Sequence, residues 1–340
     1  MDILIPTRFD RTSIIQLLTD LDATRDLDNV VVDFSRLRYS TPTAMLVAGS
    51  KLRKWHEYRQ SCGYQSSHRG IDQSVQTHSY LMHLGFFDFV HINEGRLVGE
   101  ARGSTRYLPI THLTRPPVDV GTEGVTAWYD AILDISRGLA AVVAGSGDDS
   151  EALRTYSYCI REIIRNVFEH AQVNECFICA QRWANGQVEI VIVDEGVGLA
   201  ATLMPDSDVP NDETAIRMSV RPGITRTGPA LNDPENIYGN SGFGLFVLTE
   251  LAASFGWFVF GSGSAQMTGH RNVRRVDPTS FQGTYFGLHL NAAPHSFSSV
   301  LADIISSGEE EAGVSGISRR ASGMSRFSES HSGHGENPTY

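Results

Sequence analysis

Three polar side chains recur along the segment Arg161–Ala171 at a spacing that could support proton transfer and metal binding. Glu162, Asn166 and His170 follow one another every four residues, beside an apolar stripe with helical spacing. They therefore lie along one edge of a predicted helix, where the core meets a cleft. A carboxylate can take a proton from water or a hydroxyl, and an amide oxygen one turn later suits Mg²⁺. By itself, the pattern also fits an ordinary amphipathic helix.

A second polar group follows a predicted buried strand, Val188–Asp194. The strand is mostly apolar and ends at Asp194, after which Gly196 and Gly198 complete an Asp-x-Gly-x-Gly sequence. A carboxylate at a strand end can accept a hydrogen bond from the exocyclic amine of adenine, and the glycines let the backbone approach a base closely. Alone, this pattern is also that of a strand followed by a glycine turn.

Two further segments could complete a nucleotide site. Gly242 and Gly244 lie in a run of small residues that leads into a helical pattern at Leu245, where free N–H groups and the helix dipole favour phosphates. A polar, proline-containing loop precedes them, whereas a dinucleotide fingerprint requires a strand there. Thr284 lies in an alternating strand, Gln282–Leu290, where its hydroxyl could reach adenine through a water molecule.

Composition narrows the classes of function. The chain has 340 residues, 41% of them hydrophobic, and a formal net charge of −11, which disfavours a non-specific nucleic-acid binder. The only lysines are Lys51 and Lys54, so no Gly-Lys-Ser/Thr phosphate loop exists beyond them. Phosphates would have to be held by backbone N–H groups, arginine or a metal ion.

Cysteine usage and the chain start predict a cytoplasmic protein. Cys62, Cys159, Cys176 and Cys179 are too scattered for a secreted disulfide framework. The last two have C-x-x-C spacing, but they lie in a predicted strand, where the thiols point to opposite faces; core packing is favoured over metal or redox chemistry. No signal peptide and no uninterrupted apolar stretch of membrane-spanning length is found.

The chain divides into five predicted regions. Residues 1–95 form a small α/β unit, and 96–120 are a polar joint that contains an edge strand at Tyr107–Ile110. Residues 121–292 form the larger α/β domain, and 293–305 a short helix. Residues 306–340 are rich in Ser, Gly and Glu and are predicted to be disordered.

The order of the four polar segments resembles the Bergerat-fold ATPases. That family includes gyrase B, the heat-shock chaperone ATPase, histidine kinases and anti-sigma serine kinases. The resemblance covers about residues 105–292 and rests on Glu-x-x-x-Asn on a helix, Asp-x-Gly-x-Gly after a strand, Gly-x-Gly before a helix and Gly-Thr on a last strand. It implies a two-layer α/β sandwich that binds ATP with Mg²⁺.

The same resemblance implies a role for each polar residue. Glu162 would activate or position the attacking group, and Asn166 would hold Mg²⁺. Asp194 would bind adenine. The remaining residues would shape the base pocket or contact the phosphates; they are Gly196, Gly198, Gly242, Gly244 and Thr284.

A long loop and a tripeptide refine the resemblance. Residues 200–240 would be the ATP lid, and its cations are Arg217, Arg221 and Arg226, one of which could reach the γ-phosphate. Glu169-His170-Ala171 is similar to the anti-sigma serine kinase branch, although this lid and the N-terminal extension are larger than in those compact kinases.

The N-terminal unit resembles a STAS domain, the fold of anti-sigma-factor antagonists. The matching parts are a strand, a loop, the helix after it and a late apolar segment: Val30–Phe34, Tyr39–Thr43, Thr43–Tyr58 and Leu81–Phe87. The match is incomplete, because only one strand is predicted before the first helix and Cys62–Gln73 is a poor strand.

The loop of that family can carry a phosphorylated serine or threonine. The resemblance therefore makes Ser40, Thr41 and Thr43 candidates for phosphorylation, while capping of the following helix is the other role predicted for these hydroxyls. A further short helix is predicted over Ser79–Phe87, from its apolar spacing.

We therefore expect an ATP- and Mg²⁺-binding regulatory protein in which the nucleotide site is coupled to the STAS-like unit, through which a protein partner would bind. Phosphoryl transfer to a Ser or Thr of a partner is one expected reaction. The alternatives are a gyrase- or chaperone-type ATPase, disfavoured by the missing lysine, and a nucleotide sensor without turnover. No nucleic-acid partner and no membrane span are expected, and a homodimer is left open.

Overall fold

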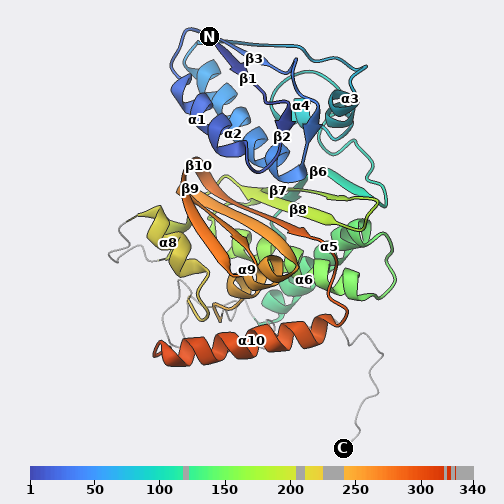
Figure 1. Cartoon of the computed structure of the whole chain (residues 1–340), viewed down its shortest axis with the longest axis vertical. Helices are drawn as coiled ribbons and strands as arrows, with labels where there is room; N and C mark the ends of the chain where they lie inside the picture. Colours follow the sequence, from blue (N-terminus) through green and yellow to red (C-terminus); the bar gives the residue numbers. More distant parts are fainter. Residues whose placement is uncertain (118–121, 204–210, 225–240, 318–319, 323–325, 327–340) are drawn as a thin grey trace, which may run out of the picture.

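The computed structural model describes residues 1–117, 122–203, 211–224, 241–317, 320–322 and 326. The protein is a mixed α/β structure with parallel and antiparallel sheets. Figure 1 shows a central sheet with one layer of helices on one face and the N-terminal unit on the other. In the described part of the chain, no helix combines the length and apolar character that crossing a membrane requires.

The central sheet has five antiparallel strands, in the spatial order β6 (Tyr107–Thr114), β7 (Glu175–Arg182), β8 (Val188–Asp194), β10 (Val273–Leu290) and β9 (Gly256–His270). Every residue of the middle strand, β8, is buried, because both of its faces are covered. This double burial explains why the strand has a nearly continuous apolar sequence. The edge strand expected at residues 107–110 is β6, and it continues to residue 114.

The helical layer consists of α5 (Thr122–Ala144), α6 (Glu151–His170), α9 (Gly244–Phe255) and α10 (Phe297–Val314). These helices bury one face of the sheet in a continuous apolar core. Helix α6 begins where the sequence predicts, because the hydroxyl of Ser150 accepts the N–H of Leu153 at 3.1 Å.

The last helix corrects the expected boundary at residue 306. A short helix over 293–305 and a disordered segment from 306 were expected, but α10 continues to Val314. Ile305 and Ala312 are buried along its inner side, and Gly308 lies so close to the Phe246 ring of α9 that a Cβ there would be 2.4 Å from it. The glycine that argued for disorder instead permits close helix packing. Of residues 315–340, only 315–317, 320–322 and 326 lie within the described part of the chain.

The N-terminal unit contains a three-stranded parallel sheet in the order β1 (Asp2–Leu4), β3 (Asn29–Asp33) and β5 (Gln65–Arg69), and a two-stranded pair of β2 (Arg8–Phe9) with β4 (Tyr39–Ser40). Two strands therefore precede the first helix, where the sequence predicted one. Strand β5 lies in the segment expected to be a poor strand. All five of its residues are exposed, so it carries no apolar alternation by which it could have been found.

Four helices complete the N-terminal unit: α1 (Ile14–Ala23), α2 (Pro42–Ser61), α3 (Gln76–His83) and α4 (Phe86–Phe89). The single helix expected over residues 79–87 is divided in two at Gly85, whose φ of +82° is left-handed and ends the first helix.

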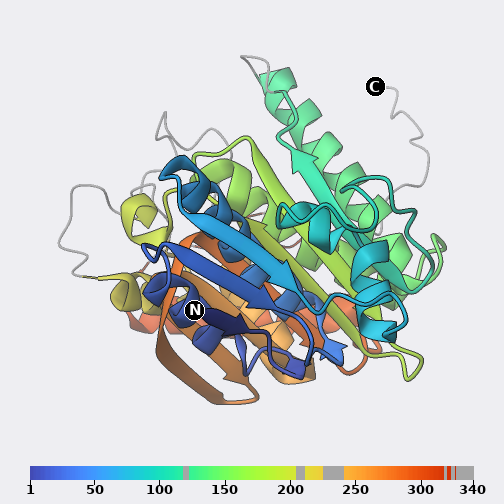
Figure 2. The same ribbon diagram turned by 90° about the horizontal axis from the view of Figure 1, so that it is seen from above.

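Helix α2 lies against the sheet face opposite the helical layer (Figures 1 and 2), and α1 also contacts β10. One apolar cluster joins Leu46 and Ala48 of α2 to Phe177, Val191 and Tyr285 of the central sheet. The N-terminal unit and the sheet therefore share a core, rather than meeting only through polar surface contacts.

The start of α2 is capped from the sheet rather than by its own loop. The N-cap residue Thr41 makes no side-chain capping bond, which corrects the predicted role of its hydroxyl. The buried carboxylate of Glu189, on β8, instead accepts the N–H of Thr43 at 2.8 Å. Burial raises the pKa of Glu189, while the contacts with Thr43 lower it. Ser40 is half-buried, and Thr41 and Thr43 are buried.

The two cysteines of the C-x-x-C segment point to opposite faces of β7, as predicted. Cys176 belongs to the core under the helical layer, and Cys179 belongs to the core shared with the N-terminal unit. Both thiols are free and buried, so they act as small apolar side chains.

Candidate functional site

A cavity opens between α6, the end of β8 and the start of α9, on the helical side of the sheet. Its empty volume, open mouth included, is about 1050 Å³. Most of the residues expected at a nucleotide site line it together; they are Glu162, Asn166, His170, Asp194, Gly198, Gly242, Gly244 and Thr284.

Helix α6 contributes the acid–amide pair. Glu162 is buried, and its Oε1 accepts from Arg161 Nη2 at 3.0 Å and lies 3.4 Å from Arg165 Nη1. The other oxygen, Oε2, points at the first turn of α9, where a Cβ on Gly244 would lie 2.4 Å from it. The half-buried Asn166 follows one turn later at the cavity wall. One oxygen of Glu162 is therefore held by arginines, and the other faces the start of α9.

Arg165 is a lining residue that the sequence analysis did not single out. It is the only arginine or lysine among the described residues that line the cavity. Its guanidinium lies between Glu162 and Glu169, with Nε 3.0 Å from Glu169 Oε1, and these acids raise its pKa against the effect of burial. Arg165 lies three residues after Glu162 and four residues before Glu169, the spacings of helical ion pairs, and this pattern could have revealed it.

Asp194 ends β8 with a buried carboxyl group, 2% exposed. Burial raises its pKa to about 7, and the charge of Glu195 adds to the rise, while backbone N–H groups of Gly196 and Thr284 oppose it. Its Oδ1 accepts the N–H of Gly196 at 2.9 Å. A buried carboxyl with a raised pKa in a cavity is a feature of functional sites.

The loop after Asp194 is held by a buried serine that the sequence analysis missed. Ser262 Oγ, on β9, accepts the N–H of Leu199 at 2.9 Å and donates to the carbonyl of Gly283 at 2.9 Å. Gly198 has a φ of +79°, and a Cβ there would be 2.9 Å from this hydroxyl. Gly198 is therefore required both for its backbone conformation and for the close approach of the loop to β9.

Gly196 is the one predicted site residue that does not line the cavity. A Cβ on it would meet the carbonyl oxygen of Ala171 at 2.1 Å, because the loop packs against the end of α6. Gly196 allows the loop to fold onto α6 and donates its N–H to Asp194, and its role in shaping a base pocket stays a prediction.

The start of α9 lines the cavity, so the free backbone N–H groups of its first turn lie beside it. Gly242 has a φ of +76°, and a Cβ on it would clash with the carbonyl of Ile224 at 2.5 Å. Gly244 is the first residue of α9 and permits contact with the Glu162 carboxylate. Helix α9 has 12 residues, so its N-terminal end carries a partial positive charge.

An apolar wall faces the polar groups. Ile192, Phe260 and Phe286 line the cavity from three adjacent strands, and Phe286 is the cross-strand partner of both others. The sequence analysis missed them, although strand alternation could have revealed them. Ile192 is two residues before Asp194 and Phe286 two residues after Thr284, so each shares a face with a predicted site residue.

The expected lid is described only in part. Helix α7 (Leu199–Leu203) and helix α8 (Asp212–Ser219) lie in it. The exposed Arg217 pairs with Glu213 on its own helix at 2.7 Å, and Arg221 donates to Ser315 Oγ at 3.3 Å. Neither arginine is among the described residues that line the cavity, and Arg226 lies outside the described residues.

A scan against protein-family models finds no match for this chain, and searches of curated proteins and of solved structures find none either. Function is therefore inferred from the residues and geometry of the cavity.

Proposed function

We propose that this chain is a regulatory protein that binds ATP with Mg²⁺ in the cavity between α6, β8 and α9. The observation that carries the proposal is that Asn166, Asp194 and Gly244, which are far apart in the sequence, line one cavity. They offer a hard oxygen ligand, a buried carboxyl acceptor and the start of a helix, which together match a metal, an adenine and a phosphate chain.

The adenine would lie against the sheet. Ile192, Phe260 and Phe286 provide an apolar surface for the base, and the Asp194 carboxylate would accept its exocyclic amine. Thr284, the cross-strand partner of Asp194, brings its hydroxyl to the same place. An apolar wall with a few convergent polar groups is typical of small-molecule sites.

The phosphates would lie toward α9, and the residues there fit a magnesium ion held partly by the nucleotide. Asn166 supplies an amide oxygen, and the described residues contain no cluster of three or more His, Cys, Asp or Glu side chains that could enclose a metal. Mg²⁺ commonly keeps waters and phosphate oxygens as its other ligands. Arg165 supplies a positive charge at the same wall, where it is paired with Glu162 and Glu169.

We also propose that residues 105–292 are a Bergerat-type ATP-binding domain and that the N-terminal unit is STAS-like. The supporting features are the positions of the four polar segments around one cavity and the docking of α2 on the opposite face of the same sheet. In this proposal, ATP binding changes how the N-terminal unit binds a protein partner.

Two reactions are compatible with the site. Transfer of phosphate to a Ser or Thr requires Glu162 to reach the acceptor hydroxyl, a task that falls to Oε2 because Oε1 is engaged by Arg161 and Arg165. The same engagement of Oε1 favours a second candidate, a nucleotide sensor without turnover.

Binding is tested by titrating purified protein with ATP and Mg²⁺ in a calorimeter. Asp194→Asn is expected to weaken binding by about 10- to 100-fold, since a hydrogen bond to a charged group contributes about 1.5–3 kcal/mol. Asn166→Ala is expected to weaken binding with Mg²⁺ but to change it little in EDTA. Asn185→Ala, in an exposed turn, is the matched control. Wild-type affinity in both site variants would place the nucleotide elsewhere, and no wild-type binding would refute the proposal.

The reaction is tested with γ-labelled ATP, Mg²⁺ and candidate protein partners. Label on a protein indicates a kinase, free phosphate indicates an ATPase, and bound but unconverted ATP indicates a sensor. Glu162→Ala should abolish either product if Glu162 positions the acceptor. Products that persist at the wild-type rate in this variant would remove Glu162 from the mechanism.

A further inference from the structure

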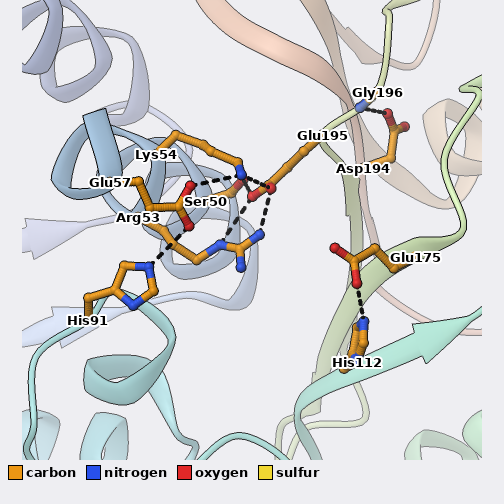
Figure 3. A network of polar contacts seen from close by, with 10 residues as sticks. All are labelled: Ser50, Arg53, Lys54, Glu57, His91, His112, Glu175, Asp194, Glu195 and Gly196. Atoms are coloured by element: carbon orange, nitrogen blue, oxygen red, sulfur yellow. Dashed lines mark hydrogen bonds and ion pairs between the residues drawn. The ribbon is translucent and has the colours of Figure 1, made fainter. Parts of the chain in front are cut away.

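The short loop after β8 has two sides that face different parts of the molecule. Asp194 turns toward the cavity, and its Oδ1 accepts the N–H of Gly196. The next side chain, Glu195, turns away from the cavity toward helix α2 of the N-terminal unit, as Figure 3 shows. Adjacent residues of one loop therefore contact the proposed nucleotide site and the N-terminal unit.

Glu195 makes the densest polar contact between α2 and the end of β8. Ser50 Oγ donates to its Oε1 at 2.8 Å, while Arg53 Nη2 lies 2.5 Å and Lys54 Nζ 3.0 Å from its Oε2 (Figure 3). The donors occupy positions i, i+3 and i+4, which form one face of the helix.

The Glu195–Arg53 part of this contact is sheltered from water, whereas the Lys54 side chain is 38% exposed. The side chains of Glu195 and Arg53 are 12% and 16% exposed. The Arg53 guanidinium also lies over the rings of Phe89 and Phe177, at 5.2 and 4.8 Å. A sheltered ion pair loses more when one partner is removed than an exposed pair does, because the remaining charge stays poorly hydrated.

The loop has little room to absorb a movement of Glu195 without moving Asp194. On one side, a Cβ on Gly283 would lie 2.2 Å from the carbonyl oxygen of Asp194 and 2.8 Å from Glu195 Cα. On the other side, Gly196 packs against the carbonyl of Ala171. Backbone packed this closely on both sides shifts as a unit.

We propose that Glu195 is a positioning residue that couples the nucleotide cavity to the docked N-terminal unit. With α2 docked, its cations hold Glu195, and the loop keeps Asp194 in the geometry that receives adenine. By thermodynamic linkage, a nucleotide bound at Asp194 strengthens the docking of α2 by the same factor. This inference rests on the proposed function and adds the route by which the two units communicate.

The first test compares loss of the Glu195–Arg53 ion pair with loss of a different charge on α2. Glu195→Gln and Arg53→Met should each weaken ATP binding about 5- to 10-fold, which is within the usual range of coupling between sites. Lys51→Met is the matched control. Lys51 also lies on α2 and reaches the sheet through Ser280 Oγ at 3.0 Å, but it does not contact the loop. Equal affinity in Glu195→Gln and wild type, or equal loss in all three variants, would overturn the coupling.

The second test measures the reverse effect, which an ion pair that merely holds the interface together would not produce. ATP should slow hydrogen exchange of α2 backbone amides in the wild type and in Lys51→Met, but not in Glu195→Gln. The Glu195→Gln, Arg53→Met double variant should bind ATP more tightly than the sum of the single losses predicts. Slowing of exchange to the wild-type extent in Glu195→Gln would overturn the proposal.

The outcomes also separate this inference from the proposed function. If the wild type does not bind ATP, the proposed function fails and the coupling with it. If the wild type binds ATP and Asp194→Asn weakens binding, while Glu195→Gln changes neither affinity nor exchange, the nucleotide site stands and only the coupling is refuted.

Discussion

Both faces of the central sheet are covered, but the carboxylates on the two faces have different surroundings. On the face toward the N-terminal unit, Glu189 accepts an N–H from the start of α2, and the loop residue Glu195 meets Arg53 and Lys54. On the helical face, Asp194 lies at a cavity wall, and burial raises its pKa to about 7. Burial raises the pKa of Glu189 as well, but Glu189 is hydrogen-bonded within a packed interface, whereas Asp194 borders an open cavity.

The two faces therefore differ in how their side chains affect the free energy of unfolding. A side chain whose charged form is disfavoured by burial makes the folded state less stable at neutral pH, and such sites commonly serve binding or catalysis. The apolar contacts of Phe177 on the opposite face have no such cost. Substitutions on the two faces should therefore change stability in opposite directions.

The largest effect is expected at the interface. Phe177→Ala removes a ring that packs edge-on against Phe89 with centroids 4.9 Å apart. Removal of a buried phenylalanine ring costs about 3–5 kcal/mol, so the free energy of unfolding should fall by that amount. Urea unfolding measures it. A loss below about 1 kcal/mol would show that the N-terminal unit is not held by this contact.

A smaller effect of opposite sign is expected from Asp194→Asn at pH 8. The folded-state pKa of about 7 lies above the usual aspartate value of 3.8, so the folded protein binds this proton more tightly than the unfolded chain does. Stability contributed by this group is therefore greatest below pH 4 and is lost as pH rises toward 7. Each pKa unit corresponds to about 1.4 kcal/mol, so the variant should gain about 2–4 kcal/mol at pH 8.

The control for this gain is the pH profile. Urea unfolding should show the wild type losing stability relative to Asp194→Asn between pH 4 and pH 7, with little difference between them at pH 4. ATP affinity should change in the other direction, since the variant lacks the charged acceptor. A variant that is less stable than the wild type at pH 8 would contradict the raised pKa.

The smallest effect concerns thiol reactivity and leaves stability unchanged. Cys62 is exposed and should react with a thiol reagent in the native protein, whereas Cys159, Cys176 and Cys179 are buried and should not. Burial also raises the pKa of these three thiols, to about 12 for Cys159. In Phe177→Ala, Cys179 should label faster than Cys176, because it lies on the weakened face. Mass spectrometry after timed labelling checks the order.

Local sequence patterns were sufficient for the elements that carry the site. The stripe of α6, the Ser150 cap, the apolar run of β8 and the opposed thiols of β7 follow from side-chain period and capping, which are properties of neighbouring residues. The candidate residues on these elements could therefore be named, although the family and the nucleotide remain proposals.

Contacts between side chains of different elements could be found only in the tertiary structure. Contacts between distant segments depend on how the layers pack, and no local pattern encodes them. This is why the absence of Gly196 from the described cavity lining and the reach of Glu195 to α2 were not foreseen. The contacts of Glu162 with Arg161 and Arg165 lie within one helix, and their spacing could have revealed them. Sequence determined the side chains along each element; packing determined which face of the sheet received a cavity and which received the N-terminal unit.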